Sequence, residues 1–434
     1  MRLRVEALGI ALALVACAKD DDRSRPTDSG SAVSATALHA SGGANAPQHT
    51  NAPYVILISL DGFRHDYLRR FPAPNILRVA KSGVRADRMI PVFPTKTFPA
   101  HYTIATGMYA EHHGIVGNSF WDPKRQAQYS MSNRAAKEDA SWYRGEPIWV
   151  TAESQGMVTG DYFFVGADAP IAGVRPTYPG GAEGEVKREE RVSGALAWLA
   201  LPDSTRPHLI TLYMNEVDDA GHQFGPTSAE VGQAIARVDS SLGRLLEGVN
   251  VFPYKDRVYV IIVSDHGMGS APKRNIEVLD TLRYPGVRLT QSGPYATLMI
   301  EHGGAERSSA VRDSINATLR HGKAYLRQDV PARLHYRADP NIGDIVVIME
   351  PKWMLVAPKD VPTSDGFGHG WDNQNAEMGA IFVAMGPGIR AGQRIEAFES
   401  VHVYPFIAHL LGLRANPQID GRLDVLLPVV SGTR

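Results

Sequence analysis

The sequence predicts an α/β domain built around buried, mainly parallel strands. From Tyr54 onward, short apolar runs rich in β-branched residues alternate with amphipathic stretches, a pattern typical of this fold class. The clearest runs are YVILIS, HLITLYM and VYVIIVS. With 434 residues, of which 44% are hydrophobic, the chain is long enough to bury a sizeable core.

The N-terminus predicts export. Arg2 and Arg4 precede an apolar run that is too short to span a bilayer comfortably. The only cysteine, Cys17, closes the stretch LVAC, which resembles the lipobox of bacterial lipoproteins. We therefore expect residues 1–16 to be a signal peptide and Cys17 to carry a lipid anchor, with the protein facing the periplasm or the cell exterior. An ordinary signal peptide with an incidental cysteine is the alternative.

Residues 17–52 are expected to form a disordered tether. They are rich in Asp, Ser, Ala, Gly and Pro and contain almost no bulky apolar side chains, so they cannot bury enough surface to offset the entropy of ordering. The whole chain has 45 Lys and Arg against 46 Asp and Glu, and this balance gives no electrostatic reason to expect nucleic-acid binding. A single cysteine also excludes an internal disulfide framework.

Acidic residues follow the three clearest strands. Asp61 follows YVILIS, Asp218 follows HLITLYM, and Asp265 follows VYVIIVS. Open α/β sheets bind ligands in the crevice outside the carboxyl ends of their strands, so these three carboxylates can converge although they are far apart in sequence. A single aspartate at such a place is commonly a helix cap. Three of them, accompanied by histidines, indicate a site.

Histidines accompany each part of this set. His222 lies four residues after Asp218, which can place both on one helical face, although a surface pair is the alternative. His266 adjoins Asp265, and His369 stands among glycines in DGFGHGWDN, which permit close approach to a ligand or mark an exposed turn. Three carboxylates and three imidazoles suit zinc better than magnesium or calcium, and six ligands exceed what one catalytic zinc uses. We therefore expect two metal ions.

FPTKTFPAH, residues 93 to 101, contains a candidate nucleophile, Thr97. An aliphatic hydroxyl needs an adjacent base or a metal to activate it. Pro99 suits the first turn of a helix, whose N-terminal amides favour developing negative charge. We expect the neighbouring Lys96 to be a solvated side chain.

Taken together, these motifs make the chain resemble the nucleotide pyrophosphatase/phosphodiesterase (type I phosphodiesterase) family of the alkaline phosphatase superfamily. The resemblance covers roughly residues 54–415 and rests on SLDG at 59, PTKTFPAHYTIATG at 94, GIVGN at 114, NEVDDAGHQFGP at 215, SDHGM at 264 and GHGWDN at 368. It implies one catalytic domain, residues 53–425, with an alkaline phosphatase-like fold: a central, mostly parallel sheet with helices on both faces. Segments near 155–195 and 270–370 are expected to elaborate the site.

The resemblance also implies a ligand set for two zinc ions. One zinc is held by Asp61, Asp265 and His266, with Thr97 as the ligand that attacks, and the other is held by Asp218, His222 and His369. Metal coordination would favour the alkoxide of Thr97. No general-base histidine is then required.

Substrate contacts are implied for three further residues. Asn118, in GIVGN, matches a family residue that donates a hydrogen bond to a phosphoryl oxygen, and its alternative is a turn residue. Phe98 and Tyr178 are expected to stack on the nucleobase, with about 1 to 3 kcal/mol gained per stack; a core role for Phe98 is the alternative. The segment GGAEGEV after Tyr178 departs from the family pattern.

The implied activity is hydrolysis of nucleotide diesters and pyrophosphates to nucleoside 5′-monophosphates through a phosphothreonine. Two zincs offset three aspartates and a threonine alkoxide, for a formal charge of about zero, which favours a monoanionic diester over a dianionic monoester. One alternative is a phosphodiesterase for glycerol- or lipid-derived head groups such as glycerophosphocholine. The other is a non-catalytic, metal-bound tethered binding protein. No stable nucleic-acid partner is expected, and the oligomeric state is left open.

Overall fold

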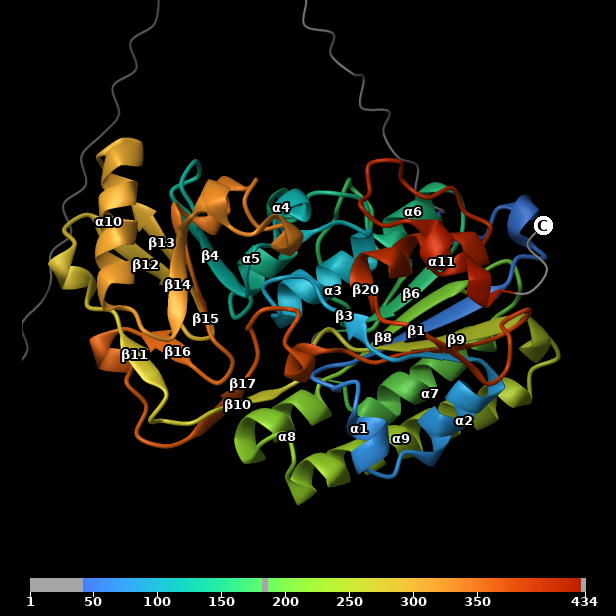
Figure 1. Cartoon of the computed structure of the whole chain (residues 1–434). Helices are drawn as coiled ribbons and strands as arrows, with labels where there is room; N and C mark the ends of the chain where they lie inside the picture. The colour runs from blue at the N-terminus through green and yellow to red at the C-terminus, as the bar shows by residue number, and fades with distance from the viewer. Residues whose placement is uncertain (1–41, 182–185, 431–434) are drawn as a thin grey trace, which may run out of the picture. The chain divides into compact units, whose positions relative to one another are not determined.

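The computed structural model describes residues 42–181 and 186–430 (Figure 1). The predicted signal peptide, Cys17 and the tether up to residue 41 lie outside the described residues. The described residues belong to one compact unit, Leu38–Arg434. Within the described ranges, no helix combines the length and the apolar character that crossing a membrane requires.

The sequence predicts a tether up to residue 52, whereas the structure packs residues 45–52 against the domain. The Asn45 side chain donates to the backbone carbonyls of Asp203 and Arg206 and accepts from the Val158 amide at 2.8 Å. His49 is buried, and its Nε2 lies 2.8 Å from a backbone carbonyl. Composition alone misses this docking because it depends on hydrogen bonds to distant parts of the chain. These contacts place residues 45–52 beside the end of the sheet where β6 and β8 begin.

The central sheet has eight strands in the order β19-β2-β18-β9-β1-β8-β6-β7. In that order they are Gln393–Ile395, Val84–Ala86, Phe382–Met385, Val258–Val263, Tyr54–Leu60, Leu209–Met214, Thr159–Tyr162 and Tyr178–Pro179. Five neighbouring pairs are parallel, and the two that involve β18 are antiparallel. The structure therefore confirms the predicted mostly parallel sheet.

Every residue of β1, β8 and β9 is buried, which explains why these strands appear in the sequence as continuous apolar runs. β1 lies between β8 and β9 and is parallel to both. Leu60 at the end of β1 is paired with Met214 at the end of β8. The carboxyl ends of the three strands therefore meet at one edge of the sheet.

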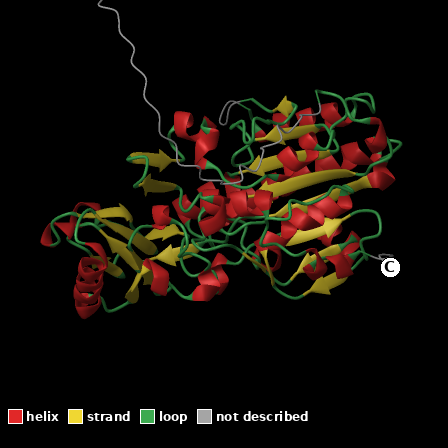
Figure 2. Ribbon diagram, turned by 90° about the horizontal axis from the view of Figure 1, so that it is seen from above, coloured by secondary structure: helices red, strands yellow, loops and turns green. Residues whose placement is uncertain are grey.

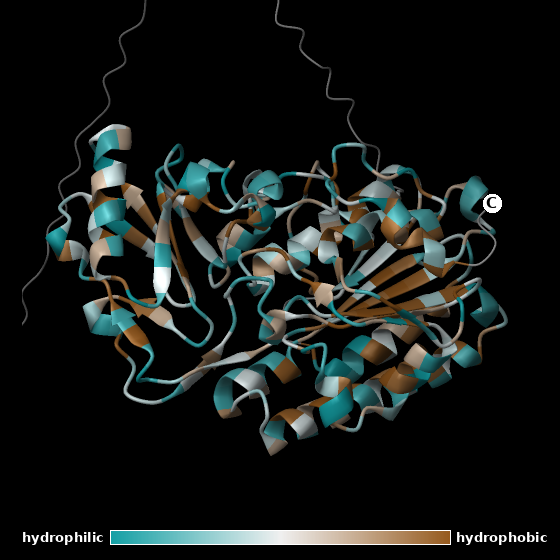
Figure 3. Ribbon diagram, viewed as in Figure 1, coloured by the Kyte–Doolittle hydropathy of each residue, from teal (hydrophilic) through white to brown (hydrophobic). Residues whose placement is uncertain are grey.

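Helices cover both faces of this sheet (Figure 1, Figure 2). Alternate residues of β1 enter two separate cores, Val55 and Leu57 on one face and Ile56 and Ile58 on the other. The first core includes residues of α3 Thr97–Thr106, α4 Ala110–His113, α5 Arg134–Glu138, α6 Ile148–Ser154 and α11 Val403–Leu410. The second includes residues of α1 Tyr67–Arg70, α2 Pro74–Ser82, α7 Arg188–Leu199, α8 Glu216–Phe224 and α9 Ala229–Asn250. The strands are the most hydrophobic layer in Figure 3.

A second, antiparallel sheet lies in the segment between β9 and β18. Its order is β12-β13-β15-β14, with bounds Val287–Gln291, Tyr295–Ile300, Ile345–Met349 and Gly322–Leu326. Residues of α10 Gly304–Thr318 join its core. This sheet is the main elaboration within residues 270–370.

Four two-stranded pairs complete the strands of the described chain. They are β10 Gly269–Ala271 with β17 Gly366–Gly368, β11 Ile276–Val278 with β16 Met354–Val356, β20 Phe398–Glu399 with β3 Met89–Ile90, and β4 Ser119–Asp122 with β5 Ala127–Ser130. β10 leaves the central sheet and β17 returns towards it. The chain that follows β17 carries His369.

Candidate active site

The seven predicted metal-site residues meet at the carboxyl edge of the central sheet. Asp61 directly follows β1, Asp265 and His266 follow β9 after one serine, Asp218 and His222 lie in α8, His369 directly follows β17, and Thr97 is the first residue of α3. They come from five segments of the chain. The convergence expected from strand order is therefore present in the fold.

The first group surrounds the Thr97 hydroxyl. His266 Nε2 lies 3.3 Å from Thr97 Oγ1, 2.8 Å from Asp265 Oδ2 and 3.5 Å from Asp61 Oδ1. Asp61 is 2% exposed, and Asp265 and His266 are fully buried. The candidate nucleophile thus faces the same point as two carboxylates and an imidazole.

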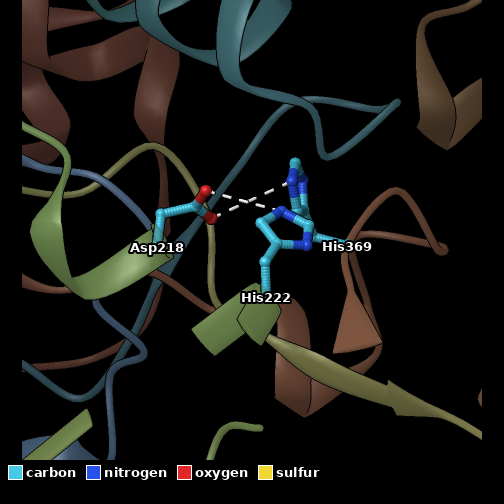
Figure 4. Close-up of side chains that lie close together, drawn as sticks. All are labelled: Asp218, His222 and His369. Atoms are coloured by element: carbon cyan, nitrogen blue, oxygen red, sulfur yellow. Dashed lines mark ion pairs between the residues drawn. The ribbon is translucent and has the colours of Figure 1, made fainter. Parts of the chain in front are cut away.

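The second group is Asp218, His222 and His369 (Figure 4). His222 Nε2 lies 3.4 Å from one carboxylate oxygen of Asp218, and His369 Nε2 lies 4.0 Å from the other. The His222 side chain is 43% exposed, whereas that of His369 is 4% exposed. The His369 ring stacks on the His266 ring with their centroids 3.5 Å apart. The two groups are therefore adjacent.

All three histidines have the tautomer that a metal ion requires. Nδ1 of His266 lies 2.9 Å from the Gly267 carbonyl, Nδ1 of His222 lies 3.0 Å from the Phe367 carbonyl, and Nδ1 of His369 lies 2.8 Å from the Thr95 carbonyl. A carbonyl oxygen only accepts, so each Nδ1 carries the proton and each Nε2 presents a lone pair. Metal-bound imidazoles are commonly held in this way.

The carboxylates need a cation. Asp61 Oδ1, Asp218 Oδ1 and Asp265 Oδ2 are buried without a hydrogen-bond partner, which is costly unless an ion or proton satisfies them. Burial raises the pKa of Asp265 to about 8 and that of Asp218 to about 6. Lone pairs on the nitrogens and oxygens converge, so the residues present fit divalent metal ions.

His101 offers an alternative ligand set with Asp61 and Asp265. Both of its ring nitrogens are already engaged, because Nδ1 donates to the Thr97 carbonyl at 2.9 Å and Nε2 lies 2.7 Å from Ser59 Oγ. His266 Nε2 instead faces Asp61 Oδ1 and Asp265 Oδ2 at the same place. Of the two imidazoles, His266 is therefore the better placed to face a metal ion together with Asp61 and Asp265.

Asn118 directly precedes β4, and its side chain reaches the N-terminus of α3. Its Oδ1 accepts from the Phe98 amide at 2.9 Å, which fixes the side-chain amide and leaves its NH₂ group as the donor. The amides of the first turn of α3 add to the positive potential beside Thr97. This arrangement favours an anionic group next to Thr97.

A pocket lies beside Thr97, with walls formed largely by aromatic rings. They belong to Phe98, Tyr143, Phe163, Phe164 and Tyr213, and the polar lining includes Lys137 and Asp168. Phe98 both lines this pocket and packs in the core, 6.3 Å from the Tyr129 ring.

One wall of the pocket is held in an unusual backbone conformation. Phe163 has φ 68°, which is rare for a bulky residue. The Arg191 guanidinium lies over its ring at 4.7 Å. The buried Asp161 accepts from the Phe164 amide at 3.2 Å. These contacts fix the wall.

Tyr178 lies away from the pocket. Its ring stacks on Trp198, with 5.9 Å between centroids, and its hydroxyl donates to the Thr205 carbonyl. The structure therefore does not bring Tyr178 to the other substrate-binding candidates. The segment where the sequence departs from the family pattern follows it directly and includes residues outside the described ranges.

Lys96 differs from the solvated side chain expected. It is half-buried, and its chain packs on Gly370, where an added β-carbon would lie 2.7 Å from Cε. Burial lowers the pKa of Lys96 to about 8, although the Asp218 carboxylate opposes this. The turn at Gly370, with φ 122°, admits the lysine to the second group.

Sequence reasoning missed two polar residues of this site, His101 and Tyr213. The Tyr213 hydroxyl donates to Asp61 Oδ2 at 2.5 Å. His101 lies one helical turn after Thr97, a spacing that was available in the sequence. Tyr213 lies within a buried strand, where a tyrosine is indistinguishable from an ordinary core residue.

A family model described as type I phosphodiesterase / nucleotide pyrophosphatase matches residues 55–372. Human ectonucleotide pyrophosphatase/phosphodiesterase family member 1 is 37% identical over 397 residues, which cover 88% of this chain and 42% of the human protein. Venom phosphodiesterase 2 of Crotalus adamanteus is 35% identical, with 89% and 49% covered. The chain thus spans less than half the length of these curated relatives.

Solved structures match over the whole of their own chains. Murine ectonucleotide pyrophosphatase/phosphodiesterase 5 has a TM-score of 0.80 and 32% identity, with 87% of this chain and 100% of that chain covered. An inactive threonine-to-alanine variant of the murine protein, in complex with AMP, gives the same values. The human protein has a TM-score of 0.82 and 31% identity, with the same coverage.

Proposed function

This chain belongs to the type I phosphodiesterase / nucleotide pyrophosphatase family, and from that premise we propose that it is a two-zinc phosphodiesterase. Its substrates would be nucleotide diesters and pyrophosphates, and its products nucleoside 5′-monophosphates. The observation that carries the proposal is the position of Thr97 Oγ1, 3.3 Å from His266 Nε2 beside carboxylate oxygens that lack partners.

Metal binding would use the two groups described above. Asp61, Asp265 and His266 would hold one ion together with Thr97, and Asp218, His222 and His369 would hold the other. Bound zinc supplies Lewis acidity, which favours deprotonation of the threonine hydroxyl and stabilises charge on phosphoryl oxygens.

Thr97 would act in two displacements. In the first, Oγ1 gives up its proton to solvent and forms a bond to phosphorus as the bond to the leaving oxygen breaks, which gives phosphothreonine; the leaving oxygen keeps its negative charge or takes up a proton from solvent. In the second, a water oxygen gives up a proton and bonds to phosphorus as the bond to Oγ1 breaks, and Oγ1 takes up one proton in its place, which regenerates Thr97. The inactive threonine-to-alanine variant of the murine neighbour supports an essential threonine in this fold.

The nucleoside would occupy the aromatic pocket. Asn118, oriented by the Phe98 amide, would donate to a phosphoryl oxygen. The rings that surround the pocket beside Thr97 provide faces for a planar base, and each stack contributes about 1 to 3 kcal/mol. This lining favours a nucleotide over a glycerol-linked head group. The AMP bound to the murine neighbour is consistent with this choice.

Lys96 changes the charge argument for substrate class. Adding its ammonium to the formal balance of two zincs against three aspartates and an alkoxide gives about +1. A substrate with an additional negative charge beyond the scissile bond is then favoured. We propose that Lys96 promotes hydrolysis of pyrophosphate-linked nucleotides.

Replacement of the nucleophile tests this function. Thr97→Ala is expected to lower turnover of a nitrophenyl nucleotide diester by more than about a thousandfold, while AMP binding measured by calorimetry remains. Thr103→Ala is the matched control, because Thr103 is buried in the same helix and its hydroxyl lies 3.0 Å from His113 Nε2. Near wild-type turnover by Thr97→Ala would exclude the mechanism.

Anchoring is a separate proposal. We propose that Cys17 is lipidated after export, which rests on the LVAC stretch in the sequence. Radiolabelled palmitate should enter the full-length protein and not Cys17→Ser. Equal labelling of both proteins would contradict this assignment.

A further inference from the structure

Each carboxylate of the first group has one oxygen held by the protein and one left free. Asp61 Oδ2 accepts from the Tyr213 hydroxyl at 2.5 Å, and Asp265 Oδ1 accepts from the Gly62 amide at 3.1 Å. The opposite oxygens, Asp61 Oδ1 and Asp265 Oδ2, are buried and have no hydrogen-bond partner. These are the oxygens that face His266 Nε2. The protein contacts therefore select which oxygen each carboxylate offers.

Tyr213 is itself firmly held. It lies in β8, is 8% exposed, and its backbone carbonyl accepts from Arg191 Nη1 at 2.6 Å. Its ring meets the His101 ring edge-on, with 5.2 Å between centroids. His101 in turn donates to the Thr97 carbonyl and lies 3.4 Å from Asp265 Oδ2. Tyr213 and His101 together form a brace that contacts both carboxylates and the nucleophile's backbone.

The same tyrosine contributes to the wall of the substrate pocket. Tyr213 thus belongs to the pocket lining, and its hydroxyl donates to Asp61 Oδ2.

We propose that Tyr213 is a positioning residue for the first metal ion, holding Asp61 so that Oδ1 alone is offered as a ligand. The inference rests on the proposed function only in requiring that the site binds zinc. Without the hydroxyl, Asp61 Oδ2 loses its donor in a buried site and the carboxylate is free to rotate. Loss of such a partner typically weakens metal binding about 10- to 100-fold.

Zinc titration of Tyr213→Phe tests the inference without using turnover. The metal-free, full-length protein is titrated with zinc against a chromophoric chelator. We expect wild type to show two sites. In Tyr213→Phe, one dissociation constant should rise roughly 10- to 100-fold and the other should stay unchanged. The aromatic ring is retained, so the pocket wall is preserved.

Tyr404→Phe is the matched control. Tyr404 is fully buried, and its hydroxyl lies 2.7 Å from Thr151 Oγ1, so the variant also loses a buried hydroxyl contact but lies outside the ligand set. Both zinc constants should remain at the wild-type values. An equal loss of zinc affinity in both variants would overturn the inference, because it would show a general effect of lost stability.

Two other results separate the inference from the proposed function. If Tyr213→Phe binds both zinc ions as wild type does, the positioning role is overturned, whereas the two-zinc activity stands. If wild type itself binds no zinc, the proposed function fails and the inference fails with it.

Discussion

The two ligand groups differ in how the fold holds them. Asp61, Asp265 and His266 follow buried central strands and are at most 2% exposed. Asp218 and His222 lie on the surface helix α8, and His369 follows β17, a strand of the segment inserted between β9 and β18. The first group is thus part of the domain core, whereas the second depends on the packing of an insertion. We expect the first ion to be bound tightly and the second to exchange more readily.

The largest effect is expected in the core group. Asp265→Asn should lower turnover by about a thousandfold or more, because it removes a ligand beside Thr97 and His266. Asp239→Asn is the control: Asp239 is 2% exposed and accepts from the amides that begin α2, so this variant loses stability but remains active. Steady-state kinetics measure both. If Asp265→Asn loses no more turnover than a substitution in the second group, the proposed difference between the two groups is wrong.

A smaller and reversible effect is expected in the exposed group. His222→Ala should lower turnover roughly 10- to 100-fold at low zinc, and added zinc should restore much of it because the site is open to solvent. Measuring turnover against free zinc concentration checks this. Asp265→Asn should not respond to zinc. If added zinc restores the turnover of neither variant, or of both variants equally, the two ligand groups do not differ in the way proposed.

A tenfold effect is expected from the charge beside the second group. The preference for pyrophosphates is the kcat/KM for a dinucleoside pyrophosphate divided by the kcat/KM for a nitrophenyl diester. Lys96→Met should lower this preference about tenfold, which corresponds to about 1.4 kcal/mol. Lys96→Arg keeps the charge and should retain more of the preference. Competition assays with both substrates measure the ratio. An equal fall for both substrates would show that the charge does not select pyrophosphates.

The smallest effect concerns the stability of the metal-free protein. The pKa of Asp265 is raised to about 8 and that of Asp218 to about 6 by burial, so the folded state retains protons that the unfolded state releases near pH 4. This stability is present below about pH 4 and is lost as the pH rises through 6 to 8. The metal-free protein should therefore melt about 3 °C or more lower at pH 8 than at pH 5. With saturating zinc, the melting temperature measured by calorimetry should depend less on pH. An equal dependence on pH with and without zinc would show that Asp265 and Asp218 are not its origin.

The sequence predicts the central sheet well because β1, β8 and β9 are buried on both faces, and such strands are continuous apolar runs. The same runs place Asp61 and Asp265 at their ends. Residues 287–349 form a smaller antiparallel sheet whose strands are partly exposed, so their pattern is weaker. Only the resemblance identified this segment as an elaboration.

The side chains that sequence reasoning could not place depend on tertiary contacts. Lys96 lies in the site because Gly370, which is far away in sequence, admits it. Tyr178 turns to Trp198 instead of the pocket, and stacking between distant rings has no local signature. Tyr213 lies within a continuous buried run in β8, so only the position of Asp61 Oδ2 reveals its hydrogen bond.

The docking of Asn45 has a practical consequence. It fixes the chain where β6 and β8 begin, through the Val158 amide and the Arg206 carbonyl, whereas the ligand groups lie where the strands end. A β-strand rises about 3.3 Å per residue, so the length of the strands, roughly 20 Å, separates the ends where they begin from the ends where the ligand groups lie. Coupling the protein to a column or a sensor chip through the segment that precedes Asn45 would leave the opposite edge open to the flowing solution.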